Sequence, residues 1–221
     1  MNTTLIAYHG DPELKARTVE QMKQHRIADT IIKGHYWQDG KGCAVGCLTH
    51  DPRGGHDQYP KQFGIPEWLA HLEDKVFEGL PEDQAKLWPE RFLSAIQPGA
   101  DFDGLADRLA IQRLRESLKM APAWGEERRQ QVVDAIEQTI EALKSSEEEA
   151  RSAAYSAANS AACSAASPAA YSAAYSVFDW ADSAANSADL FASASAIESA
   201  GWEKEADRII AELEKLPVSV V

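Results

Sequence analysis

The feature that most constrains the fold is the spacing of the large apolar residues, which recur at helical intervals before residue 145. The segments with this spacing are bounded by glycine or proline, and they cover residues 12–33, 66–79, 89–97, 101–120 and 126–143. Residues 5–8 are predicted to be a short strand or an extended lead-in, and no alternating run of strand length follows residue 10. We therefore predict an all-α fold, with a compact multi-helix body over residues 1–144.

At residue 145 the composition changes to a tract rich in alanine and serine. Units of the form x-Ser-Ala-Ala follow one another from Arg151 to Tyr175, with Pro168 in one of the serine positions. Alanine favours the helix, and small side chains let helices approach closely. We predict that residues 145–221 form an Ala/Ser-rich helical appendage and a closing C-terminal helix, which pack on the body or join subunits of a homo-oligomer. Helix propensity or repeat expansion explains the tract equally well without any partner.

The chain is acidic, with a formal net charge of −13. Binding to phosphate groups needs clustered Lys and Arg, so non-specific binding to nucleic acid or anionic lipid is not expected, whereas a basic partner surface is allowed. The uncharged run over residues 152–176 contains no Leu, Ile, Val or Phe, so we expect no membrane insertion. With no signal peptide recognised and three cysteines too few for a disulfide framework, a cytoplasmic location is expected.

Residues 34–57 concentrate side chains that bind soft metals or perform nucleophilic chemistry. Zinc is one interpretation, since two thiolates and two imidazoles are a permitted set of ligands. The metal-ligand candidates are Cys43, Cys47, His50 and His56. Because His50 lies about two helical turns beyond Cys43, the first three could meet one ion only if a helix begins after Cys43 or ends before His50. No other cofactor is predicted.

A nucleophilic cysteine is the second interpretation. The residues Gly40-Lys41-Gly42 resemble a turn that leads into a helix N-terminus at Cys43, where peptide dipoles and the lysine would lower the pKa of the thiol. Cys47 is the other candidate nucleophile. The histidines that could act as the base are His35, His50 and His56. No residue in the sequence stands out as a third catalytic member or an oxyanion hole.

A structural role is the third and favoured interpretation of the cysteines, because free cysteine packs in a core as a small hydrophobic residue. The aromatic loop that precedes them is either a cap over the core or a platform for a ligand. If it is a platform, we expect the ligand to touch His35, Tyr36, Trp37, Lys41, Cys43 and Cys47.

The stretch over residues 28–47, with Gly-Lys-Gly-Cys-Ala-Val-Gly-Cys at its end, resembles one found in uncharacterised bacterial and bacteriophage proteins. Residues 64–81, which begin Gly-Ile-Pro-Glu-Trp-Leu-Ala, share this resemblance, and such proteins often end in Ala-rich tracts. The resemblance covers roughly the first half of the chain. It implies a phage or mobile-element setting and no particular activity.

No complete catalytic constellation is recognisable. Glu73 and Asp74 are expected on an exposed helix face, and the sequence contains no Gly-rich phosphate loop and no HExxH, GxSxG or EF-hand pattern. We therefore predict a non-enzymatic binding protein that engages a partner or a small ligand through residues 35–56. The alternative is a cysteine-dependent enzyme that uses Cys43 or Cys47 with a nearby histidine, and a purely structural oligomer comes third.

Overall fold

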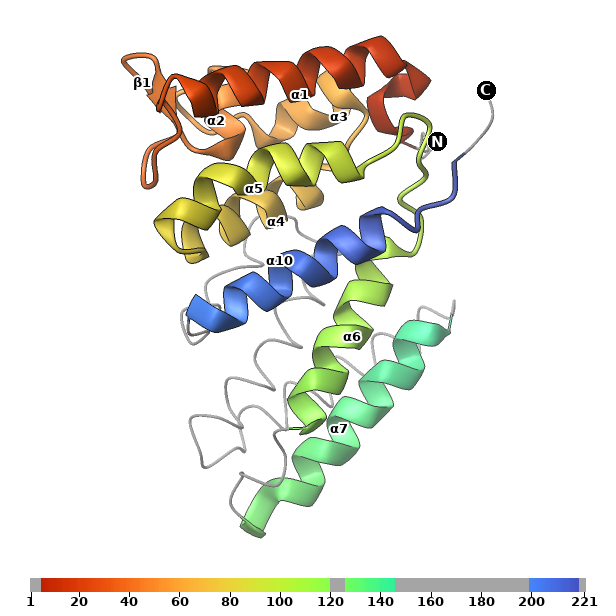
Figure 1. Cartoon of the computed structure of the whole chain (residues 1–221). Helices are drawn as coiled ribbons and strands as arrows, with labels where there is room; N and C mark the ends of the chain where they lie inside the picture. The colour runs from red at the N-terminus through yellow and green to blue at the C-terminus, as the bar shows by residue number, and fades with distance from the viewer. Residues whose placement is uncertain (1–4, 120–125, 146–198, 219–221) are drawn as a thin grey trace. The chain divides into compact units, whose positions relative to one another are not determined.

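The computed structural model describes residues 5–119, 126–145 and 199–218 (Figure 1). Residues 1–103 and 197–221 belong to one compact unit, and residues 104–196 belong to a second. The Ala/Ser repeat lies outside the described residues, so the predicted appendage and its boundary after residue 144 stay predictions.

The described residues are mostly helical, as the apolar spacing predicts. The first unit contains α1 (Pro12–Ile27), α2 (Ala44–Thr49), α3 (Tyr59–Phe63), α4 (Glu67–Gly79), α5 (Glu82–Ala95) and α10 (Ser199–Leu213). It also contains the 3₁₀ helices η1 (Ala7–Gly10) and η2 (His56–Gln58) and the strands β1 (Trp37–Gln38) and β2 (Lys41–Gly42). The second unit contains α6 (Leu105–Lys119) and α7 (Glu126–Lys144), which pack against each other. None of the helices in the described ranges has the length and apolarity needed to cross a bilayer.

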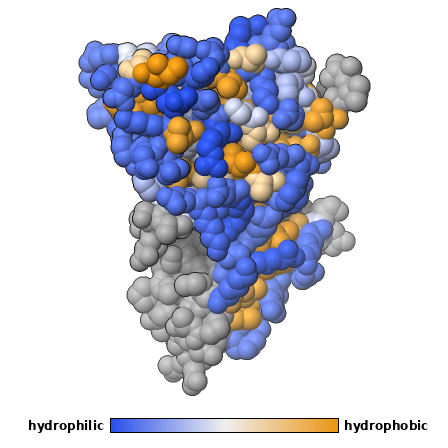
Figure 2. Space-filling view, in the orientation of Figure 1, coloured by the Kyte–Doolittle hydropathy of each residue, from blue (hydrophilic) through white to orange (hydrophobic). Residues whose placement is uncertain are grey.

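The core of the first unit is built around α5. This helix packs against α1, α4 and α10, and Figure 1 shows it between α1 and α10. Apolar side chains from all four helices are fully buried there, among them Met22, Leu69, Trp88, Phe92 and Ile209. Figure 2 shows that the hydrophobic residues on the visible face form small separate patches on a mainly hydrophilic surface.

Backbone pairing at residues 99–101 joins segments that are far apart in the sequence. The amide of Ala7 donates to the carbonyl of Ala100 at 3.0 Å, and the amide of Asp101 donates to the carbonyl of Pro217 at 2.9 Å. The predicted strand at residues 5–8 is reduced to a single bridge between Ile6 and Asp101, because the 3₁₀ helix η1 begins at Ala7.

The predicted start of the third apolar segment at Pro89 is wrong. The helix α5 begins at Glu82, after Pro81, and Pro89 lies inside it. Acidic residues in the first turn favour this earlier start. The neighbouring Trp88 is fully buried and donates its indole N–H to the carbonyl of Glu73 at 3.0 Å, so tertiary packing outweighs the local preference of proline for a helix start.

The predicted aromatic loop contains a small hairpin. Strands β1 and β2 pair antiparallel, with Trp37 opposite Gly42 and Gln38 opposite Lys41. Asp39 and Gly40 form the two-residue turn, and both have positive φ angles, as hairpin turns of this length require. Because α2 begins directly after β2, the hairpin is held beside the N-terminus of that helix.

Candidate functional site

The two described cysteines lie in the core at the start of α2. Cys47 is fully buried, and its sulfur lies 3.4 Å from the carbonyl oxygen of Gly42, to which the thiol can donate. Burial raises the pKa of Cys47 to about 12. This thiol therefore remains protonated at neutral pH and packs as a small hydrophobic group.

Cys43 occupies the position that precedes the first residue of α2, as the sequence predicts. The amides of Gly46 and Val45 act to lower the pKa of its thiol. Burial, and after it the negative charge of Asp74, act in the opposite direction and raise the pKa well above its usual value. The amides at the start of α2 thus face the thiol, but the net direction of the pKa shift opposes formation of a thiolate.

We expect both thiols to react slowly with iodoacetamide at neutral pH, because alkylation needs the thiolate and access to it. The measurement is peptide-resolved mass spectrometry of a Cys163→Ser variant before and after unfolding in urea. Unfolding should accelerate labelling of both Cys43 and Cys47 by several orders of magnitude. Rapid labelling of Cys43 in the folded protein would contradict the buried position of its sulfur.

The four predicted metal ligands do not share one set of contacts. Cys47 faces Gly42 and His50 lies on Trp37, whereas Cys43 and His56 both lie beside Asp74. Within the described ranges, no group of three or more His, Cys, Asp and Glu side chains is arranged to hold a metal ion.

A partly buried polar cluster lies where the loop after α2 meets α4, and we call it the Asp74 cluster: Tyr36, His56, His71 and Asp74. The His56 and His71 rings are stacked, with centroids 3.9 Å apart and planes 10° from parallel. The Nε2 atom of His56 lies 3.3 Å from Oδ2 of Asp74. The ring of Tyr36 meets His56 edge-on at 5.6 Å, and Tyr36 is 41% exposed.

The Asp74 cluster contains two buried polar atoms that lack a hydrogen bond. Among the residues that the structure describes, the buried atoms without a partner are Nε2 of His56, Oδ1 of Asp74 and Oε1 of Glu73. Buried polar atoms are normally paired, because leaving one without a partner costs about 1–3 kcal/mol. The cluster therefore carries an acceptor, Oδ1 of Asp74, that no group reaches in hydrogen-bond geometry, although the thiol of Cys43 also faces this carboxylate.

Burial and the charge of Asp74 shift the pKa values of the groups around this cluster. Burial, and after it the neighbouring His56, lower the pKa of His71 to about 4, so this imidazole is neutral at pH 7. Burial is the main reason for the raised pKa values of Tyr36, Cys43, Glu73 and Glu78, and the charge of Asp74 adds to each of them. A cation placed beside Asp74 would offset this negative charge.

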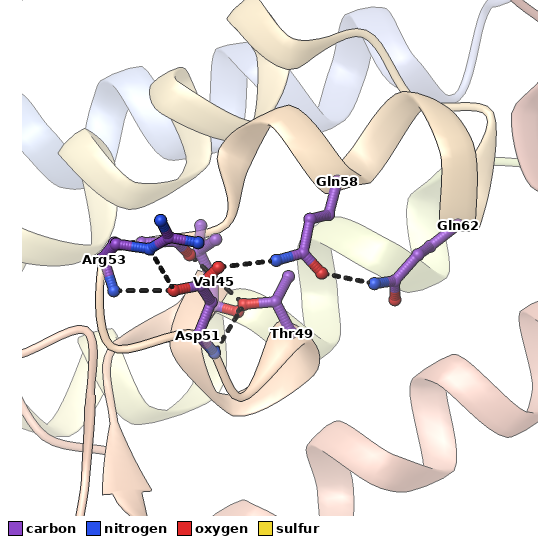
Figure 3. A network of polar contacts seen from close by, with 7 residues as sticks. Val45, Thr49, Asp51, Arg53, Gln58 and Gln62 are labelled. Carbon is purple, nitrogen blue, oxygen red and sulfur yellow. Dashed lines mark hydrogen bonds and ion pairs between the residues drawn. The ribbon is translucent and has the colours of Figure 1, made fainter.

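The loop that carries His56 is fixed by the polar network of Figure 3. The two carboxylate oxygens of Asp51 accept from the backbone amide of Arg53 and from the side-chain amide of Gln58, both at 2.8 Å. The hydroxyl of Thr49 lies within hydrogen-bond distance of the carbonyls of Val45 and Gly54. These bonds tie the loop to α2 and to η2, so His56 is presented by a rigid support.

A second group, which we call the Trp37 cluster, lies on the other side of the hairpin and contains His25, Trp37 and His50. The His50 ring is stacked on Trp37 with centroids 4.2 Å apart, and His25 meets Trp37 edge-on at 5.6 Å. The Nε2 atoms of His25 and His50 are 3.5 Å apart.

The structure brings only part of the predicted ligand platform to the two clusters. Tyr36 belongs to the Asp74 cluster, with Cys43 beside it, and Trp37 belongs to the other. The side chains of His35 and Lys41 are exposed, and Cys47 is buried in the core.

Sequence reasoning missed His25, His71 and Asp74. The expectation that Glu73 and Asp74 lie on an exposed face is wrong, since Glu73 is fully buried and the Asp74 side chain is only 15% exposed. The spacing of His71 and Asp74, three residues apart on α4, was the available signal, because such residues share a helix face.

No protein-family model matches the chain, and no significant match was found to a curated protein or to a solved structure. The geometry of the Asp74 cluster and of the Trp37 cluster is therefore the basis for assigning a function.

Proposed function

We propose that the chain is a non-catalytic binding protein that engages a basic partner, with a Lys or Arg side chain of the partner placed between Tyr36 and Asp74. The observation that supports this is the buried Oδ1 atom of Asp74, which has no hydrogen-bond partner among the described residues. Tyr36, which is 41% exposed, marks the side from which a partner could approach. The net charge of −13 would attract a basic partner from a distance.

The chemistry of the Asp74 cluster suits an ammonium or guanidinium group. Either group supplies several N–H donors, one of which could serve Oδ1 of Asp74. The ring of Tyr36 offers a cation–π contact, and the neutral His71 adds no repulsion. A carboxylate or phosphate would instead meet the negative charge of Asp74.

The energy of such a contact is modest. A hydrogen bond to a charged group contributes about 1.5–3 kcal/mol, and an exposed cation–π contact adds about 0.5–1 kcal/mol. One side chain alone would therefore bind with a Kd of about 1 mM or weaker. Tighter binding requires further contacts from the surface of a partner, which is why we favour a protein over a free amine.

The test is an NMR titration with two short probe peptides, acetyl-Gly-Lys-Gly-amide and its arginine counterpart, followed through the imidazole signals of His56 and His71. We expect these signals to shift in the wild-type protein and to stay in place in Asp74→Asn. Asp83→Asn is the matched control, because it removes the same charge from an exposed position on α5. Unmoved signals in the wild-type protein, or equal shifts in Asp74→Asn, would contradict the proposal.

A cysteine-dependent enzyme remains the second candidate, since amides of α2 do face the sulfur of Cys43. We rank this enzyme below the binding protein because the pKa of both thiols is raised. A turnover that is lost in Cys43→Ala while the fold is retained would reverse this order.

The biological setting is proposed on the sequence alone. A cytoplasmic protein of phage or mobile-element origin that binds a host or phage component agrees with the resemblance of residues 28–47. The free thiols Cys43 and Cys47 agree with a reducing compartment. Assembly into a homo-oligomer through the Ala/Ser tract is part of the same proposal.

A further inference from the structure

The two histidines of the Trp37 cluster face each other through the same type of nitrogen. The Nε2 atoms of His25 and His50 are 3.5 Å apart, which is longer than the usual hydrogen-bond distance of about 2.9–3.0 Å. Two imidazoles that share a tetrahedral ion, with each nitrogen about 2.0–2.1 Å from it, would have these nitrogens about 3.3–3.4 Å apart. The observed separation fits a shared ion better than a direct hydrogen bond.

The distance between the two imidazole rings also agrees with a shared ion. If two imidazoles with their Nε2 atoms 3.5 Å apart bound one ion at about 2.1 Å, the centroids of their rings would be about 5.4 Å apart. The His25 and His50 centroids are 5.6 Å apart, with the planes 74° from parallel. The centroid separation is therefore compatible with both Nε2 atoms binding one ion.

Thr30 can hold His25 in the tautomer that a metal requires. Its hydroxyl lies 2.8 Å from Nδ1 of His25 and 3.1 Å from the carbonyl oxygen of the same residue. When the hydroxyl donates to this carbonyl and accepts from Nδ1–H, Nε2 keeps its lone pair for a metal ion. Orientation of a ligating imidazole through its other nitrogen is the usual arrangement around metals.

His50 is held in place by different means. Its ring lies on Trp37, and its backbone occupies the left-handed region with φ at 54° as the residue that ends α2.

We propose that His25 and His50 form a surface site for a divalent transition-metal ion that prefers imidazole ligands, such as Zn²⁺, Ni²⁺ or Cu²⁺. This site is separate from the Asp74 cluster and does not depend on the function proposed for it. In the part of the chain that the structure describes, no third His, Cys, Asp or Glu completes a larger group of ligands. Water would occupy the remaining positions, and an exchangeable ligand from outside could replace it.

The experiment is calorimetric titration of Zn²⁺ and Ni²⁺ into the full chain after treatment with a chelator. The wild-type protein should bind one equivalent that is lost, or weakened at least tenfold, in His25→Gln and in His50→Asn. Asparagine is chosen at position 50 because it tolerates the left-handed backbone. Thr30→Val should lower the affinity about 10- to 100-fold, since it removes the group that orients His25.

Two controls make the result specific to this pair. His35→Asn removes an exposed histidine from the same loop region and should leave the titration unchanged. Trp37→Phe should retain binding but lose the part of the Cu²⁺-induced fluorescence quenching that comes from the indole stacked on His50. The proposal is overturned if none of the ions binds the wild-type protein, or if the equivalent survives in both His25→Gln and His50→Asn while circular dichroism shows an intact fold.

Discussion

Replacing Glu73 by glutamine is expected to make the protein more stable than the wild type by roughly 3–5 kcal/mol near pH 9, and to change its stability little near pH 4.5. Burial, and not a neighbouring charge, is the main reason, because it raises the pKa of Glu73 from 4.5 to about 8. Tyr59 donates its hydroxyl to Oε2 of Glu73 at 2.8 Å and limits the rise. The other oxygen, Oε1, is buried without a hydrogen-bond partner among the described residues.

The direction of the pH dependence follows from proton binding. Between the unfolded pKa of 4.5 and the folded pKa of about 8, the folded state holds a proton on Glu73 that the unfolded state has lost. The contribution of this group to stability is therefore fully present below about pH 4.5 and is lost as the pH rises through about 8. Glutamine cannot ionise, and its carbonyl oxygen can still accept from Tyr59, so this loss disappears in the variant.

The measurement is the free energy of unfolding in urea as a function of pH for the wild type and Glu73→Gln. Glu13→Gln is the control, because it makes the same chemical change at a side chain that is 87% exposed. The control should follow the wild-type curve within about 0.5 kcal/mol. If the free energy of unfolding changed with pH in the same way in Glu73→Gln and in the wild type, Glu73 would not be a buried, protonated acid in the folded state.

The sequence was a good guide to the helices and a poorer guide to where some of them begin. Apolar spacing and flanking proline and glycine predict α4, α6 and α7 because these signals are local. The start of α5 was mistaken because Pro89 has the local character of a helix start. Trp88 is buried inside α5 because it packs against α4, where it donates to the carbonyl of Glu73. A contact between two helices is not visible in the local sequence.

Only the part of the candidate site that comes from residues 35–56 was predicted from the sequence. Residues 35–56 supply Tyr36 and His56 to the Asp74 cluster, and this stretch was recognised by its unusual density of aromatic residues, cysteines and histidines. Asp74 comes from α4, and its burial depends on the packing of α4 against α2 and η2. No local pattern in the sequence reports that packing. For the same reason His25, which lies on α1, could not be paired with His50 in advance.

Replacing Gly46 by alanine is expected to destabilise the protein by about 3 kcal/mol or more, although the same change in a helix usually stabilises by about 0.5–1 kcal/mol. A Cβ atom at Gly46 would lie 1.5 Å from the carbonyl oxygen of Tyr36 and 2.4 Å from its carbon. These are backbone atoms, so no rotation of a side chain can relieve the overlap. Either the hairpin or α2 must move.

Because the same overlap would displace Tyr36 from His56, the change also tests whether the Asp74 cluster depends on this close approach. Gly40→Ala is the matched control: its Cβ would meet nothing within 4 Å, so only the positive φ of 79° opposes it, at about 1–2 kcal/mol. Urea unfolding gives both free energies, and the imidazole NMR signals of His56 and His71 report on the cluster. We expect these signals to move in Gly46→Ala and to stay in place in Gly40→Ala. A Gly46→Ala protein as stable as the wild type would mean that the hairpin does not rest against α2, and the support that holds Tyr36 over Asp74 would have to be sought elsewhere.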